Sequence, residues 1–166
     1  MNSNLKISII TVSFNSVITI RDTIESIISQ DYNNIEYIII DAGSKDGTLD
    51  IIKEYKEHIS YFSSEIDNGI YDGMNKGIAA ATGDIVGILN SDDFYPNSFV
   101  ISNVARTFEK QGCDAVYGDL VYVKFFDIDK IVRYWQSGEY TVKKIKNGWM
   151  LPHPTFFVKK YLYDKY

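Results

Sequence analysis

Two adjacent carboxylates, Asp92 and Asp93, follow an apolar run almost directly, and the next helical pattern begins only after Pro96. Neighbouring carboxylates repel each other unless a cation or several hydrogen-bond donors compensate their charge. Magnesium and manganese ions prefer oxygen ligands, take one or two carboxylates, and complete their shell with water and substrate phosphates. The pair therefore predicts a site for Mn²⁺ or Mg²⁺ that neutralises a departing diphosphate, with a solvated acidic turn as the alternative.

Polar residues also follow the three other apolar runs that we interpret as strands. These segments are Ser13–Asn15, Asp41–Ser44 and Glu65–Gly69. Helix capping explains some of them, because Ser, Asn and Asp satisfy the free N–H groups at the start of a helix. Capping accounts for Asn15 or Ser16, for Asp46, and for one of Asp67 and Asn68, but it leaves the aspartate pair unexplained.

Strand-like and helix-like patterns alternate along the first two thirds of the chain. We expect strands at Ile7–Phe14, Glu36–Ile40, Ile59–Ser64, Asp84–Leu89, Ala115–Phe125 and Ile131–Trp135, and helices at Val17–Gln30, from Asp46 to about Glu57, Ile70–Thr82 and Asn97–Gln111. An acidic turn at Asp127–Asp129 should join the last two strands, and Gly83 should end its helix in the left-handed conformation. Beyond Gln136 the periodicity weakens.

This alternation predicts an α/β fold with a mostly parallel sheet and helices on both faces, and ligands in such a sheet bind outside the carboxyl ends of the strands. The length of 166 residues suits one domain. We expect residues 1–95 to form a ligand-binding half and residues 96–166 to begin a second half.

Composition excludes several classes of protein. The net charge is −5 and no basic stripe is present, which argues against a nucleic-acid partner. The single cysteine, Cys113, excludes an internal disulfide, and the first apolar run is a poor signal peptide, so we expect a cytoplasmic protein with peripheral membrane contact left open. Dinucleotide-binding, phosphate-loop and serine-hydrolase motifs are absent, and Asp41–Gly47 lacks the ligand spacing of a calcium loop.

Four segments together resemble glycosyltransferase family 2, whose members adopt the GT-A fold. They are Ile9–Asn15, Ile38–Thr48, Ser64–Gly77 and Leu89–Asp93, and they occur in the order and spacing of the family. The third segment is similar to bacterial enzymes that build polysaccharides. The resemblance implies a Rossmann-like α/β/α sandwich that transfers a sugar, with inversion, from a nucleotide-sugar donor, most simply a UDP-sugar, to a saccharide or lipid-linked saccharide acceptor at the inner face of the cell membrane.

The resemblance also assigns roles to individual residues. It implies that Asp93 is the direct metal ligand and that Asp92 lies nearer the ribose. It places Phe14 against the base, although core packing is nearly as good an explanation for an apolar strand residue. The other residues that we expect to bind the nucleotide-sugar are Thr11, Ser13, Asn15, Asp41, Gly43, Asp67, Asn75 and Lys76.

The sequence departs from the common family pattern at Ala42, where relatives carry a second aspartate that can read the base. This change weakens the expectation of strict uridine selectivity. Either Asp67 makes the missing polar contact to the base, or Asp41 alone is sufficient to bind it.

Inverting transfer needs a general base, which in the family lies beyond the stretch that corresponds to Leu151–Lys160. The sequence reaches Tyr166 before such a segment, so we expect it to be truncated and the base to lie outside it. His153 is a weaker candidate for the base and a better one for an acceptor contact or a structural role. One alternative is a donor-binding module without activity. A less favoured alternative is a sugar nucleotidyltransferase, because such an enzyme would ordinarily have a glycine-rich phosphate loop where this sequence has Ser13–Asn15. The oligomeric state is open.

Overall fold

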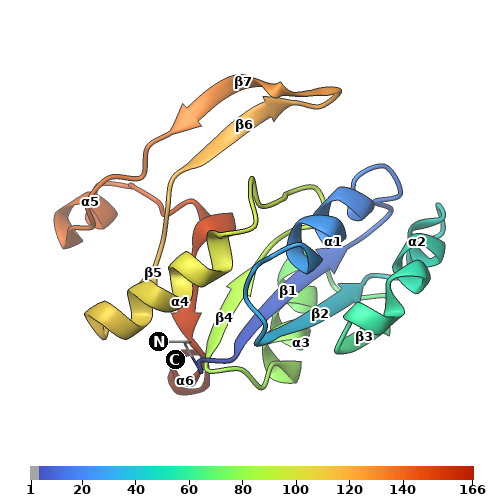
Figure 1. Cartoon of the computed structure of the whole chain (residues 1–166), viewed down its shortest axis with the longest axis horizontal. Coiled ribbons are helices and arrows are strands. Elements are labelled where there is room, and N and C mark those ends of the chain that lie inside the picture. Colours follow the sequence, from blue (N-terminus) through green and yellow to red (C-terminus); the bar gives the residue numbers. More distant parts are fainter. Residues whose placement is uncertain (1–3) are drawn as a thin grey trace.

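A computed structural model describes residues 4–166 and confirms the α/β architecture with a mostly parallel central sheet (Figure 1). The strands are β1 (Ile7–Ser13), β2 (Ile35–Asp41), β3 (Tyr61–Ser64), β4 (Ile85–Ile88), β5 (Ala115–Val116), β6 (Leu120–Lys124), β7 (Asp127–Trp135) and β8 (Phe157–Lys159). The helices are α1 (Ile20–Ile28), α2 (Thr48–Glu54), α3 (Ile70–Ala80), α4 (Val100–Gln111), α5 (Val142–Lys146) and α6 (Lys160–Lys165), with short 3₁₀ turns η1 (Lys56–His58) and η2 (His153–Thr155).

The main sheet has the strand order β3-β2-β1-β4-β8-β5. Strands β1 to β4 are parallel, and β8 runs antiparallel to both of its neighbours, β4 and β5. The central strand β1 pairs with β2 from Ile7–Ile35 to Ser13–Asp41, so the carboxyl ends of these two strands finish side by side. This register is what assembles the polar strand ends at one edge of the sheet.

The two faces of the sheet pack against different helices because successive strand residues point to opposite sides. On one face Ile7, Ile9 and Tyr37 join α1, α2 and α4 in the larger core. On the other face Ile10, Val12, Ile38, Ile40 and Val86 pack with Met74 and Ile78 of α3 and with Tyr163 of α6. Strands β1 and β2 are therefore apolar on both sides, as the continuous isoleucine-rich runs predict.

Helix α3 lies close to the sheet because it presents glycines at Gly73 and Gly77. A Cβ atom at Gly77 would collide with the side chain of Ile10, and one at Gly73 would meet Val12 Cγ1 at 3.3 Å. Gly83, after this helix, does not have the expected left-handed conformation. Its role is steric, since a Cβ there would lie 2.6 Å from Ser8 Oγ and 2.7 Å from the Lys6 carbonyl oxygen.

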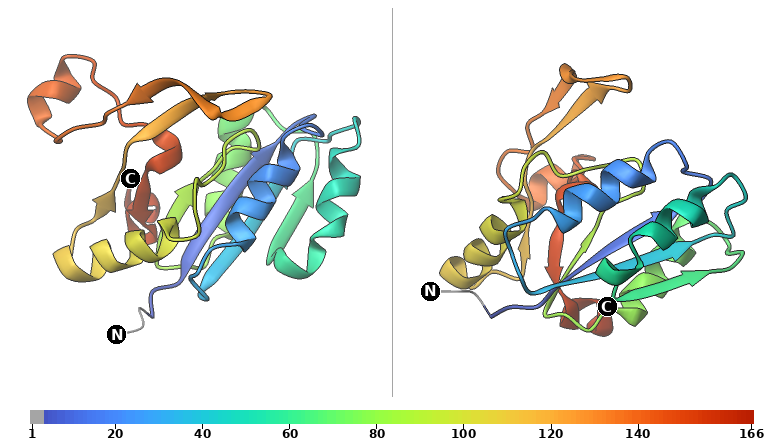
Figure 2. Two further views of the ribbon diagram at one scale, coloured as in Figure 1. Left: turned by 45° about the horizontal axis from the view of Figure 1, so that its top comes forward. Right: turned by 45° about the vertical axis from the view of Figure 1, so that its right-hand side comes forward.

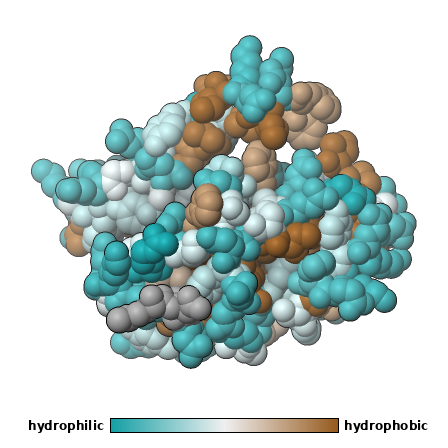
Figure 3. Space-filling model, viewed as in Figure 1, coloured by the Kyte–Doolittle hydropathy of each residue, from teal (hydrophilic) through white to brown (hydrophobic). Residues whose placement is uncertain are grey.

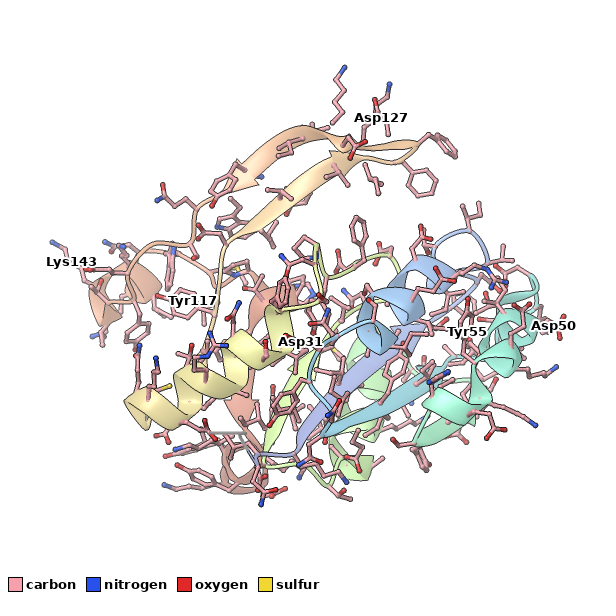
Figure 4. All side chains as sticks on the ribbon, in the orientation of Figure 1. Asp31, Asp50, Tyr55, Tyr117, Asp127 and Lys143 are labelled. Atoms are coloured by element: carbon pink, nitrogen blue, oxygen red, sulfur yellow. The ribbon has the colours of Figure 1, made fainter. Side chains whose placement is uncertain are left out.

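The segment after α4 differs most from the prediction. The expected long strand Ala115–Phe125 is divided between β5 in the main sheet and β6, which pairs only with β7 in a separate hairpin. The turn is Phe125–Phe126, and the expected acidic turn residues belong to β7. Figure 2 shows the hairpin standing apart from the main sheet, and Figure 4 shows Asp127 near its tip.

Strand β8 was not predicted because it is only three residues long and follows a stretch without periodicity. It enters the sheet beside β4, where Gly87 allows Phe157 to pack directly on the strand. A Cβ atom at Gly87 would lie 2.5 Å from the Phe157 ring. This insertion carries η2, which immediately precedes β8, to the carboxyl end of β4.

Candidate functional site

The carboxyl ends of β1, β2 and β4, with the loop after β3, enclose an open cleft of about 1050 Å³. The cleft thus lies where ligands bind in parallel α/β sheets. Of the residues expected at a site, its lining contains Ser13, Phe14, Asn15, Gly43, Asp67 and Asp92. Its lining also contains residues that sequence analysis did not assign to the site, among them Ser16, Lys45, Ile66, Asn90, Ser91 and Phe125.

Phe14 directly follows β1 and is 62% exposed, so it is not a core residue. The chain turns sharply after it, because Asn15 adopts a left-handed φ of 49°. The Asn15 amide donates to Ser44 Oγ at 2.8 Å, and its side-chain oxygen accepts from the Lys45 amide at 3.0 Å. Asn15 therefore ties the loops after β1 and β2 together and leaves the Phe14 ring on the cleft side of the turn.

Asp41 is fully buried and does not line the cleft. Its Oδ2 accepts from the amides of Gly43 (3.0 Å) and Ser44 (2.9 Å) and from Ser64 Oγ (2.7 Å), while its Oδ1 accepts from Ser44 Oγ (2.5 Å). Four protein donors occupy the carboxylate. The structure thus shows Asp41 shaping the loop that carries Ala42 and Gly43, and gives it no exposed oxygen for a base.

Three other expected residues also lie away from the lining. Thr11 is fully buried, and its hydroxyl accepts from Tyr37 at 3.2 Å. Asn75 is exposed on α3, and Lys76 forms ion pairs with Glu65 (3.0 Å) and Asp72 (3.5 Å). The solvated helix face is therefore the better description of Asn75 and Lys76 in this structure.

Asp67 remains at the cleft. Its Oδ1 accepts from the Gly69 amide at 2.8 Å, which holds the turn before α3. The second oxygen, Oδ2, lies 3.2 Å from the position that a Cβ atom would take at Gly73. Any side chain at Gly73 would press on this carboxylate.

The aspartate pair is divided between two environments. Asp92 is exposed and lines the cleft, whereas Asp93 is partly buried and lies outside the lining. Burial, reinforced by the negative charge of Asp92, raises the pKa of Asp93 to about 6. The carboxylate that faces the cleft is thus Asp92, whereas the resemblance implies that Asp93 is the direct metal ligand and Asp92 lies nearer the ribose.

The raised pKa of Asp93 predicts how it affects stability in metal-free protein. A carboxyl group whose pKa is higher in the folded state favours folding in its protonated form, so its ionisation between pH 4 and 6 destabilises the fold. Asp93→Asn should therefore raise the free energy of unfolding at pH 8 by about 1–2 kcal/mol after allowance for partial solvent screening. Urea unfolding with EDTA at pH 8 and pH 4 measures this, and a gain that persists undiminished at pH 4 would contradict it.

The residues present fit a divalent cation. The two carboxylates are adjacent, and Asp92 has no ion pair among residues 4–166 that would offset its charge. No group of three or more His, Cys, Asp or Glu side chains able to hold a metal exists in that range. A cation here would need phosphate and water ligands, as magnesium and manganese commonly do.

Two further contacts join the site to distant parts of the chain. Ser16 Oγ and Ser91 Oγ lie 2.7 Å apart and connect the loops after β1 and β4. Asn90 Nδ2 lies 3.0 Å from Nε2 of His153, which brings η2 beside the aspartate pair. Phe125 reaches the lining from the β6–β7 hairpin, and no sequence pattern indicated this because the contact depends on how the hairpin is placed.

Comparison with known proteins identifies the fold and the family. Residues 8–164 match the profile of Glycosyl transferase family 2. An uncharacterized glycosyltransferase of Mycobacterium tuberculosis is 35% identical over 113 residues, which are 68% of this chain and 43% of that protein. The chain therefore spans less than half the length of this relative.

Solved structures with similar folds include GT-A glycosyltransferases. Staphylococcus aureus TarS (residues 1–349) in complex with UDP-GlcNAc superposes with a TM-score of 0.78 at 20% identity, over 97% of this chain and 47% of that one. A mannosyltransferase of Pyrobaculum calidifontis in complex with GDP-Man and Mn²⁺ superposes with a TM-score of 0.63 at 22% identity, over 74% and 37% of the two chains. With this fold and a profile match over nearly its whole length, the chain belongs to glycosyltransferase family 2.

Proposed function

We propose that this chain binds a nucleotide-sugar, in the simplest case a UDP-sugar, and transfers its sugar with inversion to a saccharide acceptor. The observation that supports this most directly is the placement of an unpaired carboxylate, Asp92, in the same cleft as the exposed ring of Phe14. An aromatic face suits a nucleobase, and a carboxylate suits the cation that accompanies a diphosphate. The cleft is also large enough for such a ligand.

Asp92 is the residue that we assign to the cation, because it is the exposed member of the pair. Asp93 would add negative charge behind it. A bound Mn²⁺ or Mg²⁺ would stabilise the charge that develops on the diphosphate as the sugar leaves. In that reaction the acceptor oxygen forms a bond to the sugar carbon, the bond from that carbon to the diphosphate breaks, and a general base takes the hydroxyl proton.

Selectivity for the base rests on the loops after β2 and β3. Ala42 offers no side-chain hydrogen bond, and Asp41 is occupied by protein donors. The charged side chains that these two loops contribute to the lining are Lys45, Asp46 and Asp67. We expect Asp67→Ala to weaken donor binding, and unchanged affinity would remove Asp67 from the site.

Calorimetric titration with nucleoside diphosphates tests the proposal. UDP, GDP, CDP and dTDP would each be added with manganese and with EDTA. Manganese-dependent binding of UDP supports the proposed donor, and binding of another nucleotide in its place would correct the base alone. Failure of all four to bind the folded protein would overturn the donor site.

The first half of the chain is acidic and the second half is basic, which favours an anionic surface as the place where the second half meets the acceptor. Residues 1–95 contain fifteen Asp and Glu and six Lys and Arg, a net charge of −9, whereas residues 96–166 contain seven and eleven, a net charge of +4. Exposed apolar side chains also gather in the second half, around the β6–β7 hairpin (Figure 3). Among residues 4–166, no helix has the length and apolar character needed to cross a bilayer.

A basic and apolar patch surrounds α5. We define it as Tyr140, Val142, Lys143, Lys144, Ile145, Lys146 and Met150, all exposed. Figure 4 shows Lys143 at the end of the molecule that α5 forms. Exposed lysines beside apolar side chains favour the surface of an anionic membrane. We propose that this patch brings the enzyme to the inner face of the cell membrane, where a lipid-linked acceptor would lie.

Vesicle sedimentation tests this patch. The protein should bind vesicles of phosphatidylcholine that contain phosphatidylglycerol and bind pure phosphatidylcholine much less. Reversal of Lys143, Lys144 and Lys146 to Glu should reduce binding at least tenfold, since each lysine near an anionic surface contributes about 1 kcal/mol. Reversal of Lys53, Lys56 and Lys110 is the matched control, and an equal loss in that variant would show a nonspecific charge effect.

A further inference from the structure

Arg133 of β7 is a cation without an acidic partner. Its side chain is exposed, and it forms neither an ion pair nor a hydrogen bond with residues 4–166. A guanidinium is charged at every physiological pH and carries N–H donors but no acceptor. The N–H groups of Arg133 are therefore available to an anion.

Two aromatic rings hold this guanidinium in place. Tyr122 lies directly opposite Arg133 in the pairing of β6 with β7, and Trp135 follows two residues later on the same face of the strand. The guanidinium carbon lies 5.5 Å from the centre of the Tyr122 ring and 5.4 Å from that of Trp135. Cation–π attraction needs no hydrogen bond, so the rings orient the guanidinium and leave its N–H groups free. An oriented, planar guanidinium is suited to bidentate binding of a phosphate.

The base of the hairpin is fixed by Asp119. Its Oδ1 accepts from the amide (2.9 Å) and the hydroxyl (2.7 Å) of Ser137, and its Oδ2 accepts from the Tyr134 hydroxyl (2.7 Å). The Tyr117 hydroxyl, before β6, also donates to the Gly138 carbonyl, after β7, at 2.8 Å. Neutral donors thus satisfy this carboxylate, so it is not a counter-ion for the guanidinium, and the two ends of the hairpin are tied together.

The rest of the hairpin favours an amphipathic anion. Exposed apolar side chains come from both of its strands and from its turn. They are Val121, Phe126, Ile128, Ile131 and Val132. A purely hydrophilic anion would leave this apolar surface in water, whereas a hydrocarbon chain would cover it. An unpaired cation on such a surface therefore matches a phosphate that is attached to a lipid.

The hairpin also lies between the α5 patch and the cleft. Strand β7 ends on the side of α5, and the turn at the opposite end of the hairpin contributes Phe125 to the lining of the cleft (Figures 1 and 2). A lipid-linked acceptor would have its lipid toward the patch and its saccharide toward the cleft. The phosphate joins these two parts, and Arg133 lies between the two ends of the hairpin.

We propose that Arg133, oriented by Tyr122 and Trp135, binds the phosphate that joins the acceptor saccharide to its lipid. This inference rests on the proposed function and deepens it, because it names the chemical class of the acceptor, a lipid phosphate. It also separates two roles within the second half of the chain. The α5 patch binds the membrane surface, and Arg133 binds the acceptor within that surface.

Calorimetric titration with geranyl phosphate, a soluble short-chain lipid phosphate, tests this inference. The wild type should bind it about tenfold or more tighter than inorganic phosphate or geraniol, which supply the anion and the hydrocarbon separately. Arg133→Gln should weaken binding of geranyl phosphate about tenfold or more, as expected for the loss of a hydrogen bond between charged groups. Tyr122→Leu keeps an apolar side chain without the ring and should weaken it about threefold. Lys130→Gln removes the same charge from the same strand, and this matched control should bind like the wild type.

Two further measurements on Arg133→Gln separate this site from the others. Binding to phosphatidylglycerol vesicles should stay within about fivefold of the wild type, because only one charge near the surface is lost. Manganese-dependent binding of UDP should be unchanged, since Arg133 lies outside the cleft lining. The midpoint of thermal unfolding should also stay close to that of the wild type, because the exposed side chain forms no hydrogen bond within residues 4–166.

The inference is wrong if Arg133→Gln binds geranyl phosphate like the wild type or if Lys130→Gln loses as much affinity. Equal affinity of the wild type for inorganic phosphate and geranyl phosphate would show a simple anion site and would also overturn it. Nucleotide binding without geranyl phosphate binding would leave the proposed donor site standing and refute this inference alone. Arg133-dependent binding of geranyl phosphate without any nucleotide binding would overturn the donor site and leave the lipid-phosphate site standing.

Discussion

Asp92→Asn should reduce the manganese-dependent affinity for the nucleoside diphosphate about 100-fold, which corresponds to a loss of roughly 3 kcal/mol. The substitution keeps the size of the side chain and removes its negative charge. Asp92 is exposed in the cleft and has no ion pair within residues 4–166, so its charge is available to a cation that also binds the diphosphate. Calorimetric titration with and without manganese measures the change.

The comparison with Asp93 makes this prediction specific. Asp93→Asn should weaken binding far less than Asp92→Asn, because Asp93 lies outside the cleft lining. Asp31→Asn, an exposed carboxylate elsewhere on the surface, should bind like the wild type. If Asp93→Asn abolished binding while Asp92→Asn did not, the assignment from the structure would be wrong and that from the resemblance correct.

Glu36→Gln should destabilise the fold by about 2–3 kcal/mol at pH 7. Glu36 is only 8% exposed, and it accepts hydrogen bonds from Lys6 Nζ (2.5 Å), Ser8 Oγ (2.6 Å) and the amide (2.7 Å) and hydroxyl (2.5 Å) of Thr82. Burial alone would raise its pKa, but these donors outweigh burial and lower the pKa to about 2. A glutamine would place an NH₂ group against the donors that now bind the carboxylate, and it would remove the ion pair with Lys6.

The destabilisation caused by Glu36→Gln should depend on pH. Because the pKa of Glu36 is lower in the folded state than its ordinary value of 4.5, the stabilisation is complete above pH 4.5 and is lost as the pH falls toward 2. The difference between wild type and Glu36→Gln should therefore shrink between pH 5 and pH 3 in urea unfolding. Glu57→Gln, at an exposed carboxylate, should show no such change. A constant difference across this range would refute the role of the ionised carboxylate.

Local sequence was sufficient to predict the first four strands and the first four helices. The runs at Ile7–Phe14 and Glu36–Ile40 are apolar on both faces because each is buried between two layers of helices, a property that depends on composition alone. The place of the site was also predictable, since parallel strands present their carboxyl ends at one edge of the sheet. The motifs that resemble the family also contain several residues that line the cleft, among them Phe14 and Asp92.

Which polar residue of a motif faces the cleft was decided only by tertiary packing. Thr11 and Asp41 belong to the same motifs as Phe14 and Gly43, yet both are buried, because alternate residues of a strand point into opposite faces and a buried carboxylate draws its donors from neighbouring loops. The division of the aspartate pair, the entry of β8 beside β4, and the contact of Asn90 with His153, 63 residues apart, depend on how distant segments pack. Periodicity and capping describe only neighbours along the chain, so they could not predict these contacts.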